Sequence, residues 1–199
     1  MTENTPRKLI LASTSVYRRQ LLERLRLPFE VVASHVDETP LPQEPPELLA
    51  CRLALAKANS VAANNPQSVV IGSDQVADLQ GVALGKPGTH ERAVAQLQTM
   101  RGELVIFQTA VSVVCHATGF AQTALAQVKV QFRNLTDRQI EAYLLAETPY
   151  DCAGSAKSEG LGIALLERID NDDPTALVGL PLIRTCQMIE AAGIQVLRA

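Results

Sequence analysis

Residues 8–18, KLILASTSVYR, join a short apolar run, a Ser/Thr loop and the start of a helix. The first backbone N–H groups of a helix have no partner within it, and they lie at the positive end of its dipole. A strand that leads through such a loop into a helix is therefore suited to bind a phosphate or another anion. Ser13 and Ser15 in the loop are candidate substrate-binding residues.

Arg18, at the end of this segment, makes the prediction of an anion site more specific. Helical spacing aligns Arg18 with Leu21 and Leu22, whereas Arg19 aligns with Glu23. We therefore expect Arg19 at the surface, while Arg18 points inward and needs an anionic partner.

A purely structural alternative for this unit stays open. Ser13 or Ser15 would then cap the helix, and the methylene groups of Arg18 would cover an edge of the core. Strand-loop-helix units are common, and the unit alone does not prove a ligand.

Composition narrows the class of protein. The 199 residues are 47% hydrophobic, which suffices for one packed domain over residues 1–199. The formal net charge of −3 offers no basic face for duplex DNA or RNA, so the expected partner is a small nucleotide and not a nucleic acid. No apolar run approaches the ~20 residues of a membrane helix, and the run after Arg7 and Lys8 is too short for a signal peptide. We expect a cytoplasmic protein with no membrane partner.

Cysteines and histidines do not indicate a metal or redox site. The cysteines form no CxxC pair and the histidines lack metal-ligand spacing. We expect the cysteines to be reduced and buried. The residues concerned are Cys51, Cys115, Cys152, Cys186, His35, His90 and His116.

Helical and strand patterns alternate along the chain. Helices are expected from the Ser/Thr loop to residue 27, over 47–63 and 91–100, from the capping box of Thr136 and Gln139, and from Pro181 to Gly193. Strands are expected at the start of segment 8–18 and over 29–33, 68–72, 103–115, 123–132 and 161–169, with a hairpin around 118–119. This order predicts an α/β fold, a single domain with a central twisted mixed β-sheet flanked by helices.

One lysine lies on the apolar side of a predicted helix. Lys57 has Leu53 and Val61 as its neighbours at four-residue spacing. A solvated lysine would seldom occupy this position, although its long side chain could still reach past the edge of the core.

Two carboxylates follow predicted strands. Asp74 comes at the end of the strand 68–72, and Glu38 lies in the loop after 29–33. Ligand groups of α/β proteins are commonly placed at such positions. In the structural alternative, Asp74 shapes a turn and Glu38 is one of several loop acids.

The charged residues form a chemically meaningful set. Lys86, between Gly85 and Pro87, is either a turn residue or a functional cation. With Arg18 and Lys57 it would neutralise phosphate charge, while two carboxylates hold a divalent cation and activate water. The set predicts metal-assisted attack on a polyphosphate, provided that the residues converge.

Seven motifs, in this order and spacing, resemble the Maf family of nucleotide pyrophosphatases. They are LILASTSVYRR, VDET, LALAKA, IGSDQ, LGKP, CAGSAKSEG and VGLPL. The resemblance covers nearly the whole chain. It implies a Maf or ITPase-like mixed-sheet fold, a divalent cation (Mg, Mn or Co), hydrolysis of a nucleoside triphosphate to the monophosphate and pyrophosphate, and a cytoplasmic homodimer.

The resemblance also implies residue roles. Substrate binding falls to Ser13, Ser15 and Arg18, catalysis to Glu38, Lys57, Asp74 and Lys86, and metal binding to Glu38 and Asp74. Asp74 matches the proton acceptor of the family. Val16 stands where the family usually has proline, which we expect to cost some rigidity and no function.

Three further positions concern which nucleobase the substrate carries. The branch of the family that acts on dTTP and UTP has Arg, Thr and Gln where this chain has Tyr17, Gln75 and Glu159. The change resembles the branch that acts on 7-methyl-GTP, which has an aromatic residue, Gln and Glu at these positions. The chemistry agrees, because an aromatic ring can stack on a cationic base and a carboxylate can accept hydrogen bonds from guanine. In the structural alternative, Tyr17 is a half-exposed helix residue and Glu159 a solvated acid.

The expected reaction is thus hydrolysis of 7-methyl-GTP to 7-methyl-GMP and pyrophosphate, which removes modified nucleotides. The nearest alternative is the same reaction on dTTP or UTP. A non-enzymatic regulator of septum formation, the process after which the Maf family is named, is a more distant one.

Overall fold

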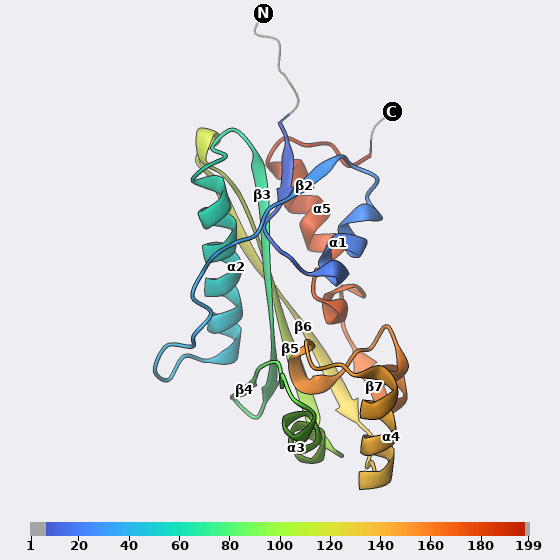
Figure 1. Cartoon of the computed structure of the whole chain (residues 1–199). Helices are drawn as coiled ribbons and strands as arrows, with labels where there is room; N and C mark the ends of the chain where they lie inside the picture. The colour runs from blue at the N-terminus through green and yellow to red at the C-terminus, as the bar shows by residue number, and fades with distance from the viewer. Residues whose placement is uncertain (1–6, 198–199) are drawn as a thin grey trace, which may run out of the picture.

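The computed structural model describes residues 7–197, which form one α/β unit (Figure 1). The helices in this part of the chain are α1 (Val16–Glu23), α2 (Pro46–Ala62), α3 (His90–Met100), α4 (Asp137–Glu147) and α5 (Leu182–Ala191). The strands are β1 (Leu9–Leu11), β2 (Phe29–Val31), β3 (Val69–Leu79), β4 (Val82–Leu84), β5 (Leu104–Cys115), β6 (Phe120–Phe132) and β7 (Leu166–Asp170). Four 3₁₀ turns are described, η1 (His116–Thr118), η2 (Ala153–Ser155), η3 (Leu161–Leu165) and η4 (Ala176–Val178).

The strands build one mixed sheet, which confirms the predicted fold class. Their order is β2-β1-β3-β5-β6-β7, and β4 pairs with β3. The pairs β1–β2 and β1–β3 are parallel, whereas β3–β4, β3–β5, β5–β6 and β6–β7 are antiparallel. The hairpin of β5 and β6 turns through η1 and Gly119, whose φ of 67° is favourable for glycine.

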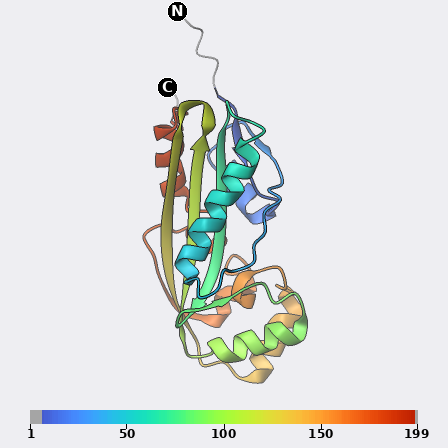
Figure 2. The same ribbon diagram turned by 90° about the vertical axis from the view of Figure 1, so that its left-hand side faces the viewer.

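Helices cover both faces of the sheet. Helix α2 runs along one face, α1 and α5 lie on the other, and α3 and α4 pack near the end opposite the termini (Figures 1 and 2). Strand β5 alternates between the two layers, because Val111 and Val113 pack with Leu22 while Ala110 packs with Leu53. Coverage of both faces explains the apolar sequence of the central strands.

Two helices begin at capping residues that the sequence predicted. The Ser15 hydroxyl caps α1 by accepting a hydrogen bond from the Arg18 backbone N–H at 3.4 Å. Thr136 and Gln139 form the predicted capping box of α4.

The prediction for residues 68–84 was partly wrong. Strand β3 runs to Leu79 instead of ending near Gly72, and Val82–Leu84 forms an additional strand, β4. The polar residues Ser73 and Asp74 suggested a loop, but β3 keeps its pairing with β5 from Val70 to Asp78. Pairing with a neighbouring strand overrides the local polar signal, since each polar group finds a partner in the folded protein.

Other boundaries also differ. Helix α1 ends at Glu23 instead of near 27, because Arg26 has a φ of 55°, which a helix cannot contain. Residues 161–165 form a 3₁₀ turn instead of the first half of the predicted strand.

The cysteines are free, as expected, but Cys115 is the one that is buried, while Cys51, Cys152 and Cys186 are half-exposed. The expectation of buried cysteines was therefore wrong for three of them. No helix within residues 7–197 is long and apolar enough to cross a membrane.

Candidate functional site

The site lies beside an open stretch of the β3 edge. Strand β1 ends at Leu11, which pairs with Ile71, and β4 leaves β3 again at Leu84, which pairs with Ala77. Between these pairings, no strand of residues 7–197 neighbours Asp74 on this side of β3. The Ser/Thr loop after β1 approaches this stretch from one end, and the segment after β4 approaches it from the other.

A glycine brings α2 close to the strand. A Cβ atom on Gly72 would lie 2.3 Å from the Ala54 carbonyl oxygen and 2.6 Å from the Ala58 nitrogen. Only glycine allows this approach of helix and strand. Lys57, on the same face of α2, can therefore reach Asp74.

Lys57 joins the two predicted carboxylates. Its Nζ lies 2.7 Å from Oδ1 of Asp74 and 2.6 Å from Oε1 of Glu38. The Lys57 side chain is only 7% exposed, so the alternative in which it reaches past the core to solvent is wrong. Asp74 lies within a strand, and so it does not shape a turn.

The two carboxylates differ electrostatically. Burial raises the pKa of Asp74 above its ordinary value of 3.8, although the positive charges of Lys57 and Arg18 act in the opposite direction. Burial also acts to raise the pKa of Glu38, but the hydrogen bond and charge of Lys57, together with Lys86 and Arg18, hold it below its ordinary value of 4.5. Burial thus makes Asp74 a better proton acceptor than an ordinary aspartate, whereas the neighbouring cations make Glu38 a poorer one than an ordinary glutamate.

Arg18 points inward and Arg19 outward, as the helical phase predicts. The Arg18 Nε donates to the Gly179 carbonyl oxygen at 2.8 Å, and a guanidinium nitrogen lies 3.5 Å from Oγ of Ser13. Desolvation lowers the pKa of Arg18, against the charges of Asp74 and Glu38, which places all three in one electrostatic group. Arg19 pairs with the exposed Glu23 at 2.9 Å.

Ser13, Ser15 and the segment that contains Gly179 lie around Arg18. The capping alternative is correct for Ser15, whose hydroxyl accepts from the Arg18 N–H at 3.4 Å, and this does not exclude a ligand. The Ser15 backbone N–H in turn donates to Oγ of Ser13 at 3.1 Å. Ser73 Oγ lies 2.7 Å from the Ala110 carbonyl oxygen and 2.9 Å from the Gly179 carbonyl oxygen, the acceptor that Arg18 also uses, and it can donate to either.

The loop that carries Glu38 is tied to α2. Arg52 donates through Nε and a terminal nitrogen to the two carboxylate oxygens of Glu44, at 2.6 and 2.7 Å. The same arginine donates to the Thr39 carbonyl oxygen at 3.1 Å. Lys86 follows β4 and is exposed, and its charge acts on Glu38.

Tyr17 belongs to a second group of residues. The Lys157 Nζ lies 5.9 Å from the centroid of the Tyr17 ring. Burial, with the neighbouring Cys152 and Asp151, raises the pKa of Tyr17 to about 12, so its hydroxyl stays protonated at neutral pH. Glu159 is exposed, and its charge acts on both Lys157 and Cys152. Tyr17 and Glu159 therefore share one neighbourhood.

Gln75 is anchored by its own amide. Its Nε2, which carries two hydrogens, lies within hydrogen-bond distance of three acceptors, Thr109 Oγ1 at 2.9 Å and the Ala176 and Leu177 carbonyl oxygens at 3.0 Å. Within residues 7–197, no hydrogen bond joins Gln75 to Tyr17 or Glu159. Gln75 thus holds the turn η4, which leads to Gly179.

The carboxylates suit a hard divalent cation. In the described part of the chain, Glu38 and Asp74 each contact Lys57 through one oxygen, which leaves the second oxygen of each for a ligand. No cluster of three or more His, Cys, Asp or Glu that could hold a metal occurs among the described residues. Two carboxylates, completed by substrate phosphates and water, are typical of Mg²⁺ sites.

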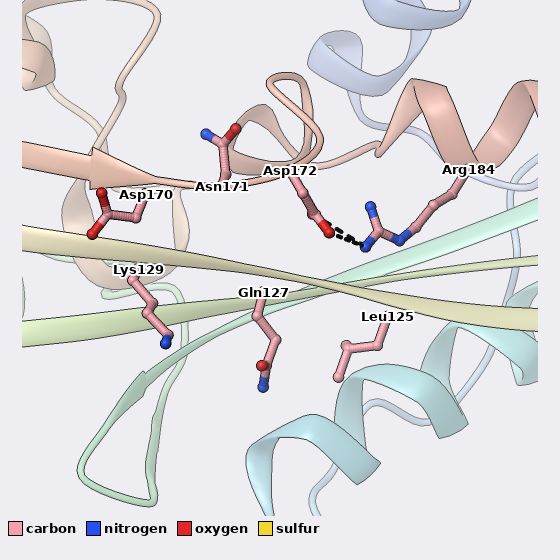
Figure 3. Close-up of a pocket in the computed structure, with 7 residues that line it drawn as sticks. All are labelled: Leu125, Gln127, Lys129, Asp170, Asn171, Asp172 and Arg184. Carbon is pink, nitrogen blue, oxygen red and sulfur yellow. Dashed lines mark hydrogen bonds and ion pairs between the residues drawn. The ribbon is translucent and has the colours of Figure 1, made fainter.

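A separate hollow of about 300 Å³ lies at the other edge of the sheet, between β6, β7 and α5 (Figure 3). Asp172 accepts two hydrogen bonds there from Arg184, at 2.9 and 3.1 Å, so these two charges neutralise each other. None of the predicted site residues lines this hollow.

The profile of one protein family, described as Maf-like protein, matches residues 8–192. The chain belongs to the Maf family. A 7-methyl-GTP pyrophosphatase of Albidiferax ferrireducens is 73% identical over 199 residues, which cover all of both chains. A 7-methyl-GTP pyrophosphatase of Burkholderia pseudomallei is 60% identical over 192 residues, 95% of this chain and 89% of that protein. The structure of a HAM1 protein from Coxiella burnetii aligns with a TM-score of 0.45 and 11% identity, over 65% of this chain and 74% of the other.

The Maf motifs also contain residues to which the sequence analysis gave no role. Gly179, in VGLPL, accepts from Arg18 and Ser73, and Lys157, in CAGSAKSEG, lies beside Tyr17. Their presence in these motifs was the available signal. Their contacts depend on segments about 160 and 140 residues apart in the chain, which no local pattern predicts.

Proposed function

We propose that this protein hydrolyses 7-methyl-GTP to 7-methyl-GMP and pyrophosphate. The observation that carries the proposal is the buried Lys57 ammonium between Glu38 and Asp74, beside the inward-facing Arg18. This arrangement combines a proton acceptor, a pair of carboxylates and several cations, as cleavage of a polyphosphate requires. The names of the similar Maf proteins support the same reaction and substrate.

Each charged residue has a proposed part in the reaction. Asp74 accepts a proton from the attacking water, the P–O bond between the α- and β-phosphates breaks, and pyrophosphate leaves. Arg18, Lys57 and Lys86 neutralise phosphate charge, and Ser13 and Ser15 position the phosphates at the start of α1. Glu38 and Asp74 would hold the divalent cation, which supplies Lewis-acid stabilisation of the phosphate oxygens when bound.

The base would be selected by the second group. The Tyr17 ring offers a face on which a cationic methylated guanine can stack, and Glu159 offers two acceptor oxygens for the guanine N–H groups. Gln75 would act by holding turn η4, because its amide nitrogen contacts the Ala176 and Leu177 carbonyl oxygens. A homodimer and a cytoplasmic location remain predictions of the family resemblance.

Product analysis tests the reaction. We would incubate the protein with 7-methyl-GTP, GTP, dTTP and UTP in Mg²⁺, Mn²⁺ or Co²⁺, and identify products by chromatography. The expected outcome is 7-methyl-GMP with an equal amount of pyrophosphate, and no reaction after chelation of the metal. Inorganic phosphate without pyrophosphate would contradict the bond assignment, and preference for dTTP or UTP would contradict the substrate.

Asp74→Asn tests the proposed proton acceptor. We expect kcat to fall at least ~100-fold, as for loss of a general base. Asp78→Asn is the matched control, because Asp78 lies on the same strand and accepts hydrogen bonds from Gln108 and from the Gly81 backbone away from Lys57. Near-normal turnover of Asp74→Asn would move the role to another residue.

A further inference from the structure

Helix α4 presents two polar side chains, one turn apart, to the loop that carries Glu159. Tyr143 Oη donates to the Ser155 carbonyl oxygen at 3.1 Å and accepts from the Lys157 backbone N–H at 3.0 Å. Glu147, four residues later on the helix, binds the same loop further along.

Glu147 uses both of its carboxylate oxygens. Oε1 lies 2.6 Å from the Lys157 Nζ, and Oε2 accepts from the Leu161 backbone N–H at 2.7 Å. The Glu147 side chain is 15% exposed. One carboxylate therefore fixes both ends of the segment 157–161, in whose middle Glu159 lies.

The loop is folded tightly around this carboxylate. A Cβ atom on Gly160 would lie 2.7 Å from Oε2 of Glu147, and a Cβ atom on Gly162 would lie 2.4 Å from the Lys157 carbonyl oxygen. Two glycines are thus required for the loop to close over Glu147. The conformation that presents Glu159 depends on a side chain from another element.

Glu147 also controls a charge beside the base-binding ring. The Lys157 Nζ that it contacts is the cation 5.9 Å from the Tyr17 ring centroid. A free ammonium there would compete with a cationic base for the ring and repel it. Because Glu147 pairs with Lys157, little net charge remains beside the Tyr17 ring.

We propose that Glu147 is a positioning residue for base selection, which holds the Glu159 loop in place and neutralises Lys157 beside Tyr17. The proposal rests on the proposed function. It implies that the charge of Glu147 matters more for a methylated, cationic guanine than for an unmethylated one.

Glu147→Gln tests the proposal, because the amide oxygen can still accept from Leu161 while the negative charge is lost. We expect the ratio of kcat/KM for 7-methyl-GTP to that for GTP to fall about tenfold, mainly through KM, as for a unit charge roughly 6 Å from a cation at an effective dielectric constant of ~40. Lys157→Met removes the ammonium and leaves Glu147, so the same ratio should be kept or rise. The double variant should return the ratio towards that of the unmutated protein.

Glu141→Gln is the matched control on α4, since Glu141 is exposed and pairs with His90 at 3.0 Å. An equal loss for both substrates in Glu147→Gln would mean a merely structural role and overturn the proposal. A fall of the ratio in Lys157→Met would also overturn it, and this variant decides the matter if Glu147→Gln does not fold. Failure of the unmutated protein to hydrolyse 7-methyl-GTP would instead contradict the proposed function, and this proposal with it.

Discussion

The Lys57 ammonium lies 2.7 Å from Oδ1 of Asp74, although one residue belongs to α2 and the other to β3. Both side chains are buried, at 7% and 10% exposure. A buried carboxylate without a cation is strongly disfavoured, so the two residues depend on each other.

Lys57→Met should therefore impair both stability and catalysis. We expect a loss of about 3 kcal/mol in the free energy of unfolding, as for removal of one partner of a buried ion pair, and a fall in kcat of at least ~100-fold. Urea denaturation and steady-state kinetics measure the two effects. Lys129→Met, on the exposed side of β6, should change neither, and a fully active Lys57→Met variant would remove lysine from the proposed mechanism.

Gly72→Ala tests the close approach of α2 and β3. The added methyl group would meet the Ala54 and Ala58 backbone at 2.3 and 2.6 Å, so the helix must move. We expect a loss of about 1–3 kcal/mol from overpacking, and lower activity because Lys57 shifts away from Asp74. For stability, Gly85→Ala is the control, since within the described residues no atom outside Gly85 and its two chain neighbours lies within 4 Å of its Cβ position. An unchanged urea midpoint for Gly72→Ala would contradict the importance of this contact.

Arg18→Ala and Arg19→Ala compare the two sides of α1. Arg18 faces the proposed phosphate site, so its removal should lower kcat/KM by roughly 10- to 100-fold, the effect of a lost charge-assisted hydrogen bond. The Arg19 side chain makes an exposed pair with Glu23, and its removal should have little effect. The reverse ranking would show that neither the helical phase nor the phosphate site is correctly placed.

The anchor of the Glu38 loop should depend on pH. The hydrogen bonds from Arg52 lower the pKa of Glu44 from 4.5 to about 2. Because the folded-state pKa is depressed, this pair stabilises the protein above about pH 4.5, and its contribution is lost as the pH falls through about 2. The difference in urea midpoint between the unmutated protein and Glu44→Gln should shrink across this window. Glu23→Gln should show little difference at any pH, and a constant difference for Glu44→Gln would contradict the assignment.

Base recognition is tested by Glu159→Gln and Tyr17→Ala. Glu159→Gln should lower kcat/KM for 7-methyl-GTP by roughly tenfold to a hundredfold, because an amide replaces a charged acceptor of guanine hydrogen bonds. Tyr17→Ala should cost about 0.5–2 kcal/mol for 7-methyl-GTP and less for GTP, since only the methylated base carries a positive charge. If Tyr17→Ala left the ratio of the two substrates untouched, recognition of the cation by this ring would be ruled out.

The sequence by itself determined the local features of the site. Helical periodicity separated the inward Arg18 from the outward Arg19, and the neighbours of Lys57 placed it on the apolar side of α2. These predictions succeed because a residue's place on a helix depends only on its spacing from nearby apolar residues. The mixed sheet was likewise predictable from alternating strand and helix patterns.

Only the tertiary structure decided which of these residues meet. Asp74 looked like the end of a short strand, yet it lies inside β3, where β1 has stopped and β4 has left the edge open. Glu147 showed no sign of a role until α4 placed it against the loop of Lys157. Such contacts join residues from separate elements, and their geometry is set by strand pairing and helix packing, which a local pattern does not encode.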